Sequence, residues 1–242
     1  MTPEARRDLL AASLDEVRQR IGRACTAAGR DPGSVALVAV TKTYPASDVV
    51  LLAGLGVTDV GENKDQEAAA KSAAVQAEDV ALRWHFVGQL QRNKAKSVVT
   101  YADVVESVDS MRLAGALSTA AVRLRERPLD VLVQVSIDGD PARGGAIAGA
   151  AEADRDLWRV AAAVNDAGGL RLGGVMAVAP LGWEPERAFT ELAVLTARLR
   201  SEYPDATVVS AGMSGDLEQA VRHGATHVRI GTSLLGMRNT LR

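Results

Sequence analysis

The sequence predicts a closed barrel of parallel β-strands, each followed by a helix, and three observations support this fold class. Short runs rich in β-branched and apolar residues alternate with longer segments of helical period. We count eight such runs, and a chain of 242 residues has a length typical of an eight-fold barrel. No linker rich in Pro, Gly or Ser divides the chain. We therefore expect one domain over residues 1–242, a single (β/α)8 TIM barrel.

Each predicted strand is a short apolar run that ends at a polar or glycine-containing stretch. The predicted strands cover residues 35–40, 57–61, 82–87, 104–107, 129–137, 172–179, 207–211 and 227–230. The predicted helices between them cover residues 46–54, 64–77, 89–98, 110–125, 146–167, 184–202 and 214–223. Residues 139–145, "GDPARGG", form the most loop-like stretch.

An extra helix is predicted before the first strand. Thr2 is a suitable N-cap and Pro3 suits the first helical position. Apolar residues recur at helical spacing from Leu10 to Cys25, so this helix has one face to bury. Cys25, the single cysteine, is expected to be a core residue of this face.

Composition narrows the classes of partner and location. The 28 Lys and Arg residues nearly balance 30 Asp and Glu residues, so we expect no nucleic-acid partner and no binding to a membrane surface. One cysteine cannot form an internal disulfide, which suits a reducing compartment. Charged residues interrupt the first apolar segment, so it does not read as a signal peptide. We expect a cytoplasmic protein and a monomer, although the sequence itself does not reveal whether the chain dimerises.

A lysine stands at the end of the first predicted strand, in "VALVAVTKTYP". In barrels of this type the functional residues gather at the carboxyl ends of the strands. Lys42 shares its alternation with Val38 and Val40, and Arg229 lies on the inward alternation of the last strand. We expect both side chains to point inward at this end. A buried ammonium is costly, so Lys42 either extends to water or is held there for chemistry.

The last two strands each run into a small-residue turn that opens a helix, in "SAGMSGDLEQAV" and "IGTSLLG". The amides at a helix N-terminus attract anions, and barrels often bind phosphate after strands seven and eight. Taken singly, Ser214 and Thr232 are more typical of simple helix caps. Together, at neighbouring strands, they favour a phosphate site.

These segments resemble the YggS/PROSC family of pyridoxal phosphate homeostasis proteins, whose fold is similar to the amino-terminal domain of alanine racemase. The resemblance covers nearly the whole chain and rests on seven segments in the family's order. They are "VAVTKTYP", "DVGENKDQE", "WHFVGQLQRNKAK", "VESVDS", "GGVMAVAP", "SAGMSGDLEQAV" and "VRIGTSLLG". The chain departs from the family pattern at Lys64 and Asp65 and within "VSIDGDPARGG", at Ser136 and Arg143, and we expect these positions at the rim of the site.

The resemblance implies that the cofactor is pyridoxal 5'-phosphate (PLP), held by Lys42 as an internal aldimine, and that no metal is needed. It further implies an arginine, Arg229, facing the pyridine nitrogen. The remaining implied cofactor-binding residues are Asn63 and Met176 beside the ring and Ser214, Gly231 and Thr232 at the phosphate. Glu62, His85 and Met213 are candidates for supporting the site from behind these residues.

The chemistry of these residue types agrees with that implication. A lysine must be neutral to attack an aldehyde, and burial at an apolar strand end beside an arginine would lower its pKa. A permanently charged arginine opposite the ring nitrogen disfavours protonation of the ring, which weakens the ring as an electron sink.

Three functions remain open. The first is a carrier of PLP for cofactor homeostasis and delivery to apo-enzymes that need it, without strong catalysis of its own. The second is an amino-acid racemase on the same barrel, which would need a second acid/base group opposite Lys42. No tyrosine supplies that group obviously, since Tyr44 is followed by Pro45. The third is an aldolase that uses Lys42 without a cofactor.

Overall fold

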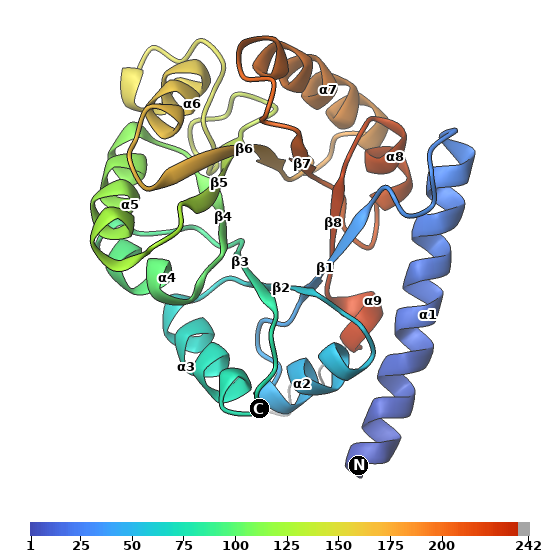
Figure 1. Cartoon of the computed structure of the whole chain (residues 1–242). Coiled ribbons are helices and arrows are strands. Elements are labelled where there is room, and N and C mark those ends of the chain that lie inside the picture. The colour runs from blue at the N-terminus through green and yellow to red at the C-terminus, as the bar shows by residue number, and fades with distance from the viewer. Residues whose placement is uncertain (237–242) are drawn as a thin grey trace.

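The computed structural model describes residues 1–236, and these residues form a closed parallel barrel (Figure 1). The eight strands pair in chain order from β1 to β8, and β1 pairs with β8 to close the barrel. The strands are β1 (Ala36–Val40), β2 (Asp59–Glu62), β3 (Arg83–Phe86), β4 (Val104–Val108), β5 (Leu129–Val135), β6 (Leu170–Ala177), β7 (Val208–Ser210) and β8 (His227–Ile230). The predicted barrel and strand order are confirmed.

Helices surround the barrel on its outer side. They are α1 (Pro3–Ala27), α2 (Ala46–Gly54), α3 (Asp65–Gln76), α4 (Ala95–Tyr101), α5 (Met111–Leu124), α6 (Leu157–Asn165), α7 (Pro185–Glu202), α8 (Leu217–Arg222) and α9 (Thr232–Leu235). Among residues 1–236, no helix combines the length and the apolar character needed to cross a membrane.

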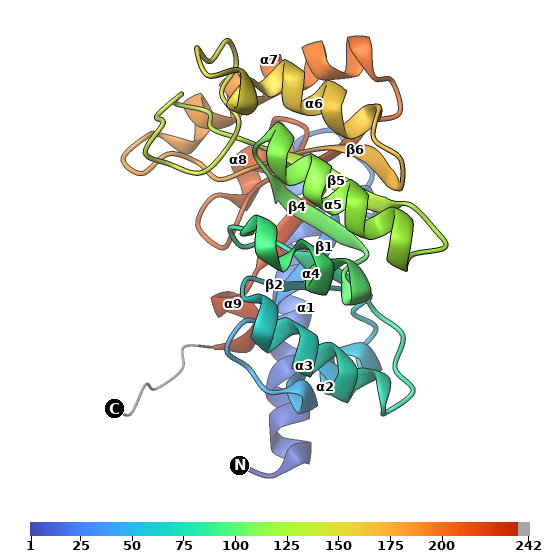
Figure 2. The same cartoon turned by 90° about the vertical axis from the view of Figure 1, so that its left-hand side faces the viewer.

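The extra helix α1 lies along the outside of the barrel beside α8 and α9 (Figures 1 and 2). Thr2 caps it as predicted, since the Thr2 hydroxyl accepts from the amide of Ala5. Its apolar face, including the fully buried Cys25, packs in one core cluster with Val228 and Ile230. These two residues therefore point outward under the helices, which leaves Arg229 to point into the barrel.

Two predicted helices begin more than one turn later than the sequence pattern suggests. The helix predicted for residues 146–167 begins only at Leu157, because the Asp156 carboxylate caps it by accepting from the amide of Arg159. The preceding segment forms isolated bridges at Ala146 and Ile147 instead. The helix predicted for residues 89–98 is α4, which begins at Ala95 after a 3₁₀ turn.

Candidate functional site

The predicted site residues follow the ends of adjacent strands. Lys42 lies two residues beyond β1, and Asn63 directly follows β2. The turn after β7 contains Ser214, and Gly231 and Thr232 follow β8. Because β8 pairs with both β7 and β1, the two turns and the lysine lie at one sector of the carboxyl end of the barrel.

The Lys42 side chain is exposed, so the expectation of a buried lysine is wrong. Strand β1 ends at Val40, and Lys42 belongs to the following turn, where strand alternation no longer directs it into the core. Within residues 1–236 its amine makes no hydrogen bond or ion pair. The lysine therefore has an accessible, unpaired amine at the carboxyl end of the barrel.

The turn after β7 is built differently from the prediction. Helix α8 begins at Leu217 rather than at Ser214, so Ser214 does not cap the helix. The Asp216 carboxylate accepts from the amide of Met213 at 2.6 Å, which draws the turn tight. The amides of Ser214 and Gly215 have no acceptor within residues 1–236, and they remain available to a ligand.

The turn after β8 supplies further amides. Thr232 begins the four-residue helix α9, and within residues 1–236 the amides of Thr232 and Ser233 have no acceptor, whereas those of Leu234 and Leu235 donate to the Gly231 carbonyl. The hydroxyl of exposed Thr232 lies at the same place. Two neighbouring turns with unpaired amides and hydroxyls form a suitable cradle for an anion.

Helix α1 braces the turn after β7. The Arg20 guanidinium donates to the carbonyl oxygen of Ser214 at 2.6 Å and forms a two-contact ion pair with Glu218 of α8, at 2.5 and 2.6 Å. The chain's extra helix is therefore attached directly to the turn that contains Ser214.

Arg229 is buried in the barrel interior, as its strand alternation predicts. Its Nη1 donates to the carbonyl and hydroxyl oxygens of Ser210, at 2.7 and 2.8 Å, and its Nη2 donates to the carbonyl of Ala177 at 2.8 Å. These bonds fix the guanidinium plane and leave its Nε–H and one Nη2 hydrogen for another partner.

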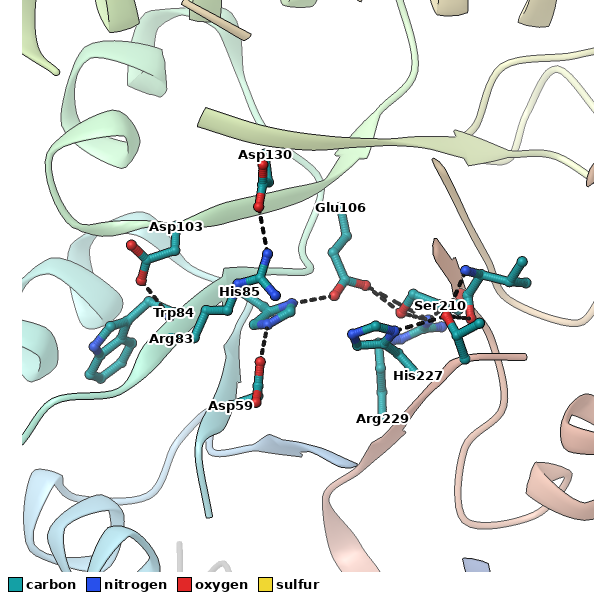
Figure 3. Close-up of polar contacts among 12 residues, drawn as sticks. Asp59, Arg83, Trp84, His85, Asp103, Glu106, Asp130, Ser210, His227 and Arg229 are labelled. Atoms are coloured by element: carbon teal, nitrogen blue, oxygen red, sulfur yellow. Dashed lines mark hydrogen bonds and ion pairs between the residues drawn. The ribbon is translucent and has the colours of Figure 1, made fainter. Parts of the chain in front are cut away.

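Beside Arg229 the barrel contains a network of charged side chains (Figure 3). His85 contacts Glu106 through Nδ1 at 2.6 Å and Asp59 through Nε2 at 2.9 Å. Glu106 accepts from the Ser210 hydroxyl at 2.6 Å and lies 3.9 Å from the Arg229 guanidinium. His85 is thus part of this interior network rather than at the end of its strand.

The network holds opposite charges in balance. Burial alone would lower the pKa of His85, but the hydrogen bonds and charges of Asp59 and Glu106 raise it to about 9. Burial alone would raise the pKa of Glu106, but His85 and Arg229 lower it to about 2. Two carboxylates therefore face two cations in the interior, and the cluster is neutral overall.

The other predicted residues have separate environments. Asn63 has a buried Oδ1 that lacks a partner among the described residues, and a cavity of about 670 Å³ opens beside it. Met176 packs inside the barrel with Val104 and Leu132. Glu62 forms a 2.5 Å ion pair with Lys71 of α3, so it supports the site from the helix side of the sheet.

Sequence reasoning missed Asp59, Glu106, Ser210, Arg20 and Lys71. A glutamate within the otherwise apolar run "VVESV" was a signal for Glu106, because a charge in a core strand needs a partner. The spacing of Glu67 and Lys71, four residues apart on a predicted helix, was a signal for an ion pair. Nothing local in the sequence indicates that Arg20 contacts a turn 194 residues later.

Chemically, the site combines an accessible amine, an anion cradle and a fixed guanidinium. The amine can attack a carbonyl carbon, and the cradle can bind a phosphate. The guanidinium can donate to a ring nitrogen or an oxygen. This arrangement suits a phosphorylated carbonyl compound.

Comparison with known proteins agrees with this chemistry. The family model described as "Alanine racemase, N-terminal domain" matches residues 12–239. A Pyridoxal phosphate homeostasis protein of Mycobacterium leprae is 43% identical over 93% of this chain and 91% of its own. A protein of the same name from Escherichia coli K12 is 38% identical over 95% of this chain and 97% of its own.

A solved structure is similar over the whole barrel. PipY of Synechococcus elongatus PCC7942, solved with PLP bound, is 31% identical and superposes with a TM-score of 0.76. The match covers 94% of this chain and 100% of that one.

Proposed function

Because the chain belongs to the alanine racemase N-terminal domain family, and within it to the pyridoxal phosphate homeostasis proteins, we propose that it binds PLP at the carboxyl end of the barrel. Its role is to hold the cofactor through Lys42 and to take part in intracellular PLP homeostasis, including delivery to apo-enzymes. It acts as a monomeric carrier in the cytoplasm and not as a catalyst.

One observation carries this proposal. At the ends of three adjacent strands the chain combines an unpaired lysine amine, two turns with unpaired amides and a fixed interior arginine. A simple pair of helix caps would not require the lysine or the arginine. A ligand with a phosphate, an aldehyde and a ring nitrogen uses all three.

The residues fit PLP when each polar group of the ligand is compared with the chain. The amides of Ser214 and Gly215, with Thr232, suit the phosphate, and Gly231 directly precedes Thr232 at the end of β8. The Nε–H and free Nη2 hydrogen of Arg229 suit the ring nitrogen, and the buried, unpartnered Oδ1 of Asn63 suits a ligand donor.

When bound, PLP supplies an aldehyde that reacts reversibly with amines. Lys42 provides the amine that retains the cofactor, and its accessible position allows the cofactor to enter and leave. Arg229 stays protonated, so it would donate to the ring nitrogen and disfavour protonation of that nitrogen. This arrangement favours storage over the stabilisation of carbanions.

A carrier role is also supported by the names of the relatives, which are homeostasis proteins rather than enzymes. Racemisation needs a second acid/base group opposite the lysine. The tyrosine nearest in sequence, Tyr44, donates its hydroxyl to the carbonyl of Gly236 at 2.5 Å. That hydrogen bond directs Tyr44 toward the end of α9.

Borohydride trapping tests the proposal. PLP is added to the purified protein, the mixture is reduced, and the modified peptide is identified by mass spectrometry. We expect the adduct on Lys42 and its loss in Lys42→Arg, which keeps the charge but removes the nucleophile. Lys64 and Lys94, on the rim, serve as internal controls. An adduct found mainly on either of them would refute the assignment.

A further inference from the structure

Hydrogen bonds hold the residues before and after Lys42 in the sequence, although the lysine amine itself is unpaired. On one side, the Thr41 hydroxyl donates to Glu62 at 2.7 Å and the Thr41 carbonyl accepts from Lys71 at 2.7 Å. On the other side, the Thr43 amide donates to Glu67 at 2.5 Å. The backbone is thus fixed immediately before and after Lys42.

Thr43 adopts an unfavourable backbone conformation at this place. Its φ of 69° lies in the left-handed region, which β-branched residues rarely occupy. Such a conformation persists only where surrounding contacts enforce it, and it occurs most often at functional sites. The hydrogen bond that the Thr43 amide donates to the Glu67 carboxylate is the contact that holds this residue.

Lys71 connects the parts of this arrangement. Its ammonium is buried and donates to Thr41, to Glu62 at 2.5 Å and to Glu67 at 2.9 Å. These three acceptors use all three of its hydrogens. Lys71 is therefore not a competing nucleophile, and it joins the β1 turn to the end of β2 and to α3.

We propose that Glu62, Glu67 and Lys71, here called the Lys42 clamp, are positioning residues that hold the Lys42 amine where it can reach the aldehyde of the bound cofactor. This inference rests on the proposed function. It goes further by assigning a role to three residues outside the proposed ligand contacts. The clamp fixes the base of the lysine side chain and leaves its amine free to react.

A purely structural ion pair between β2 and α3 is the alternative, and two ligands distinguish the two roles. PLP can bond to Lys42. Pyridoxine 5'-phosphate has the same ring and phosphate but an alcohol in place of the aldehyde, so it cannot. If the clamp positions Lys42, its loss weakens the binding of PLP alone. If its loss loosens the whole site, the binding of both ligands weakens.

The main variant is Glu67→Ala, because the Glu67 side chain is 28% exposed and its removal should leave the fold intact. We expect PLP affinity to fall about tenfold or more, the effect of one charge-assisted hydrogen bond. Affinity for pyridoxine 5'-phosphate should stay within about twofold. Glu67→Gln retains an oxygen acceptor for the Thr43 amide and should recover most of the loss.

A second variant tests the buried part of the clamp. Glu62→Gln combined with Lys71→Met removes both charges together and avoids an unpaired buried ion. The matched control is Arg125→Met, since Arg125 also donates to two carbonyls, those of Val99 and Ala102, away from the site. We expect the double variant to lose PLP selectively and the control to bind both ligands normally.

The results distinguish failure of the proposed function from failure of the clamp. Wild-type protein that does not trap PLP on Lys42 overturns the proposed function and the clamp with it. Wild-type protein that traps PLP on Lys42, with clamp variants that bind it equally well, overturns the clamp alone. Equal losses of PLP and pyridoxine 5'-phosphate also overturn it, because they indicate a structural role.

Discussion

Loss of the proton from His85 should destabilise the folded protein as the pH rises above 6.5. The pKa of this buried histidine is raised from 6.5 to about 9, because the hydrogen bonds and charges of Asp59 and Glu106 outweigh its burial. A change of one unit in pKa corresponds to about 1.4 kcal/mol, so the rise from 6.5 to about 9 means that the charged ring contributes about 3 kcal/mol of stability. That contribution is complete below pH 6.5 and is lost as the pH rises through 9.

Glu106 gives the opposite dependence at acid pH. Its pKa is lowered from 4.5 to about 2, so its contribution is complete above pH 4.5 and is lost as the pH falls toward 2. Both values describe largely the same His85–Glu106 interaction and are not added. The free energy of unfolding should therefore be greatest between about pH 4.5 and 6.5.

Histidine NMR measures this directly, because the chain has three histidines. We expect one imidazole to stay protonated beyond about pH 8. His227 should instead lose its proton below its usual range, because its burial and the nearby charge of His85 lower its pKa. The variants His223→Gln and His227→Gln assign the signals. Three imidazoles that are all neutral by about pH 7 would refute the reasoning.

Urea denaturation tests the energetic consequence. Between pH 6 and pH 9 the free energy of unfolding should fall by about 3 kcal/mol in the wild type. The decrease should be much smaller in Glu106→Gln, which keeps the shape but not the charge. It should be unchanged in His223→Gln, which alters a surface histidine paired with Glu186. An undiminished decrease in Glu106→Gln would show that another group is responsible.

Three further predictions concern the ligand. Ser214→Ala with Thr232→Ala should weaken PLP at least tenfold, since charge-assisted hydrogen bonds contribute about 1.5–3 kcal/mol each, and wild-type protein should bind unphosphorylated pyridoxal poorly. Equal wild-type affinity for the two would argue against the phosphate cradle. Arg20→Ala should weaken PLP binding several-fold, because Arg20 holds the turn that contains Ser214. Its control is Arg18→Ala, which removes contacts to the carbonyls of Leu55 and Gly56 instead. Holo-protein incubated with alanine or serine in deuterated water should exchange no α-proton at an enzymatic rate, and rapid exchange lost in Lys42→Ala would favour the racemase.

The chain's local patterns were sufficient to predict the barrel and the end of it where the site lies. Eight apolar runs that alternate with helical segments indicate parallel strands, because burial on both faces of a strand requires apolar residues on both alternations. The alternation of Val228, Arg229 and Ile230 correctly predicted an arginine inside and aliphatic residues outside. The same patterns failed at residues 146–156, where Asp156 delays the helix that periodicity alone would start earlier.

Only the tertiary structure decided how the charged groups pair. Asp59, His85 and Glu106 come from three strands, and their contacts depend on the register of the closed barrel. Lys42 illustrates the same limit, since the sequence indicated a buried strand end whereas the fold gives an exposed amine on a clamped turn. Periodicity reports which face of an element is buried. Which polar groups meet is set by contacts between residues distant in the chain, and those exist only when the barrel closes.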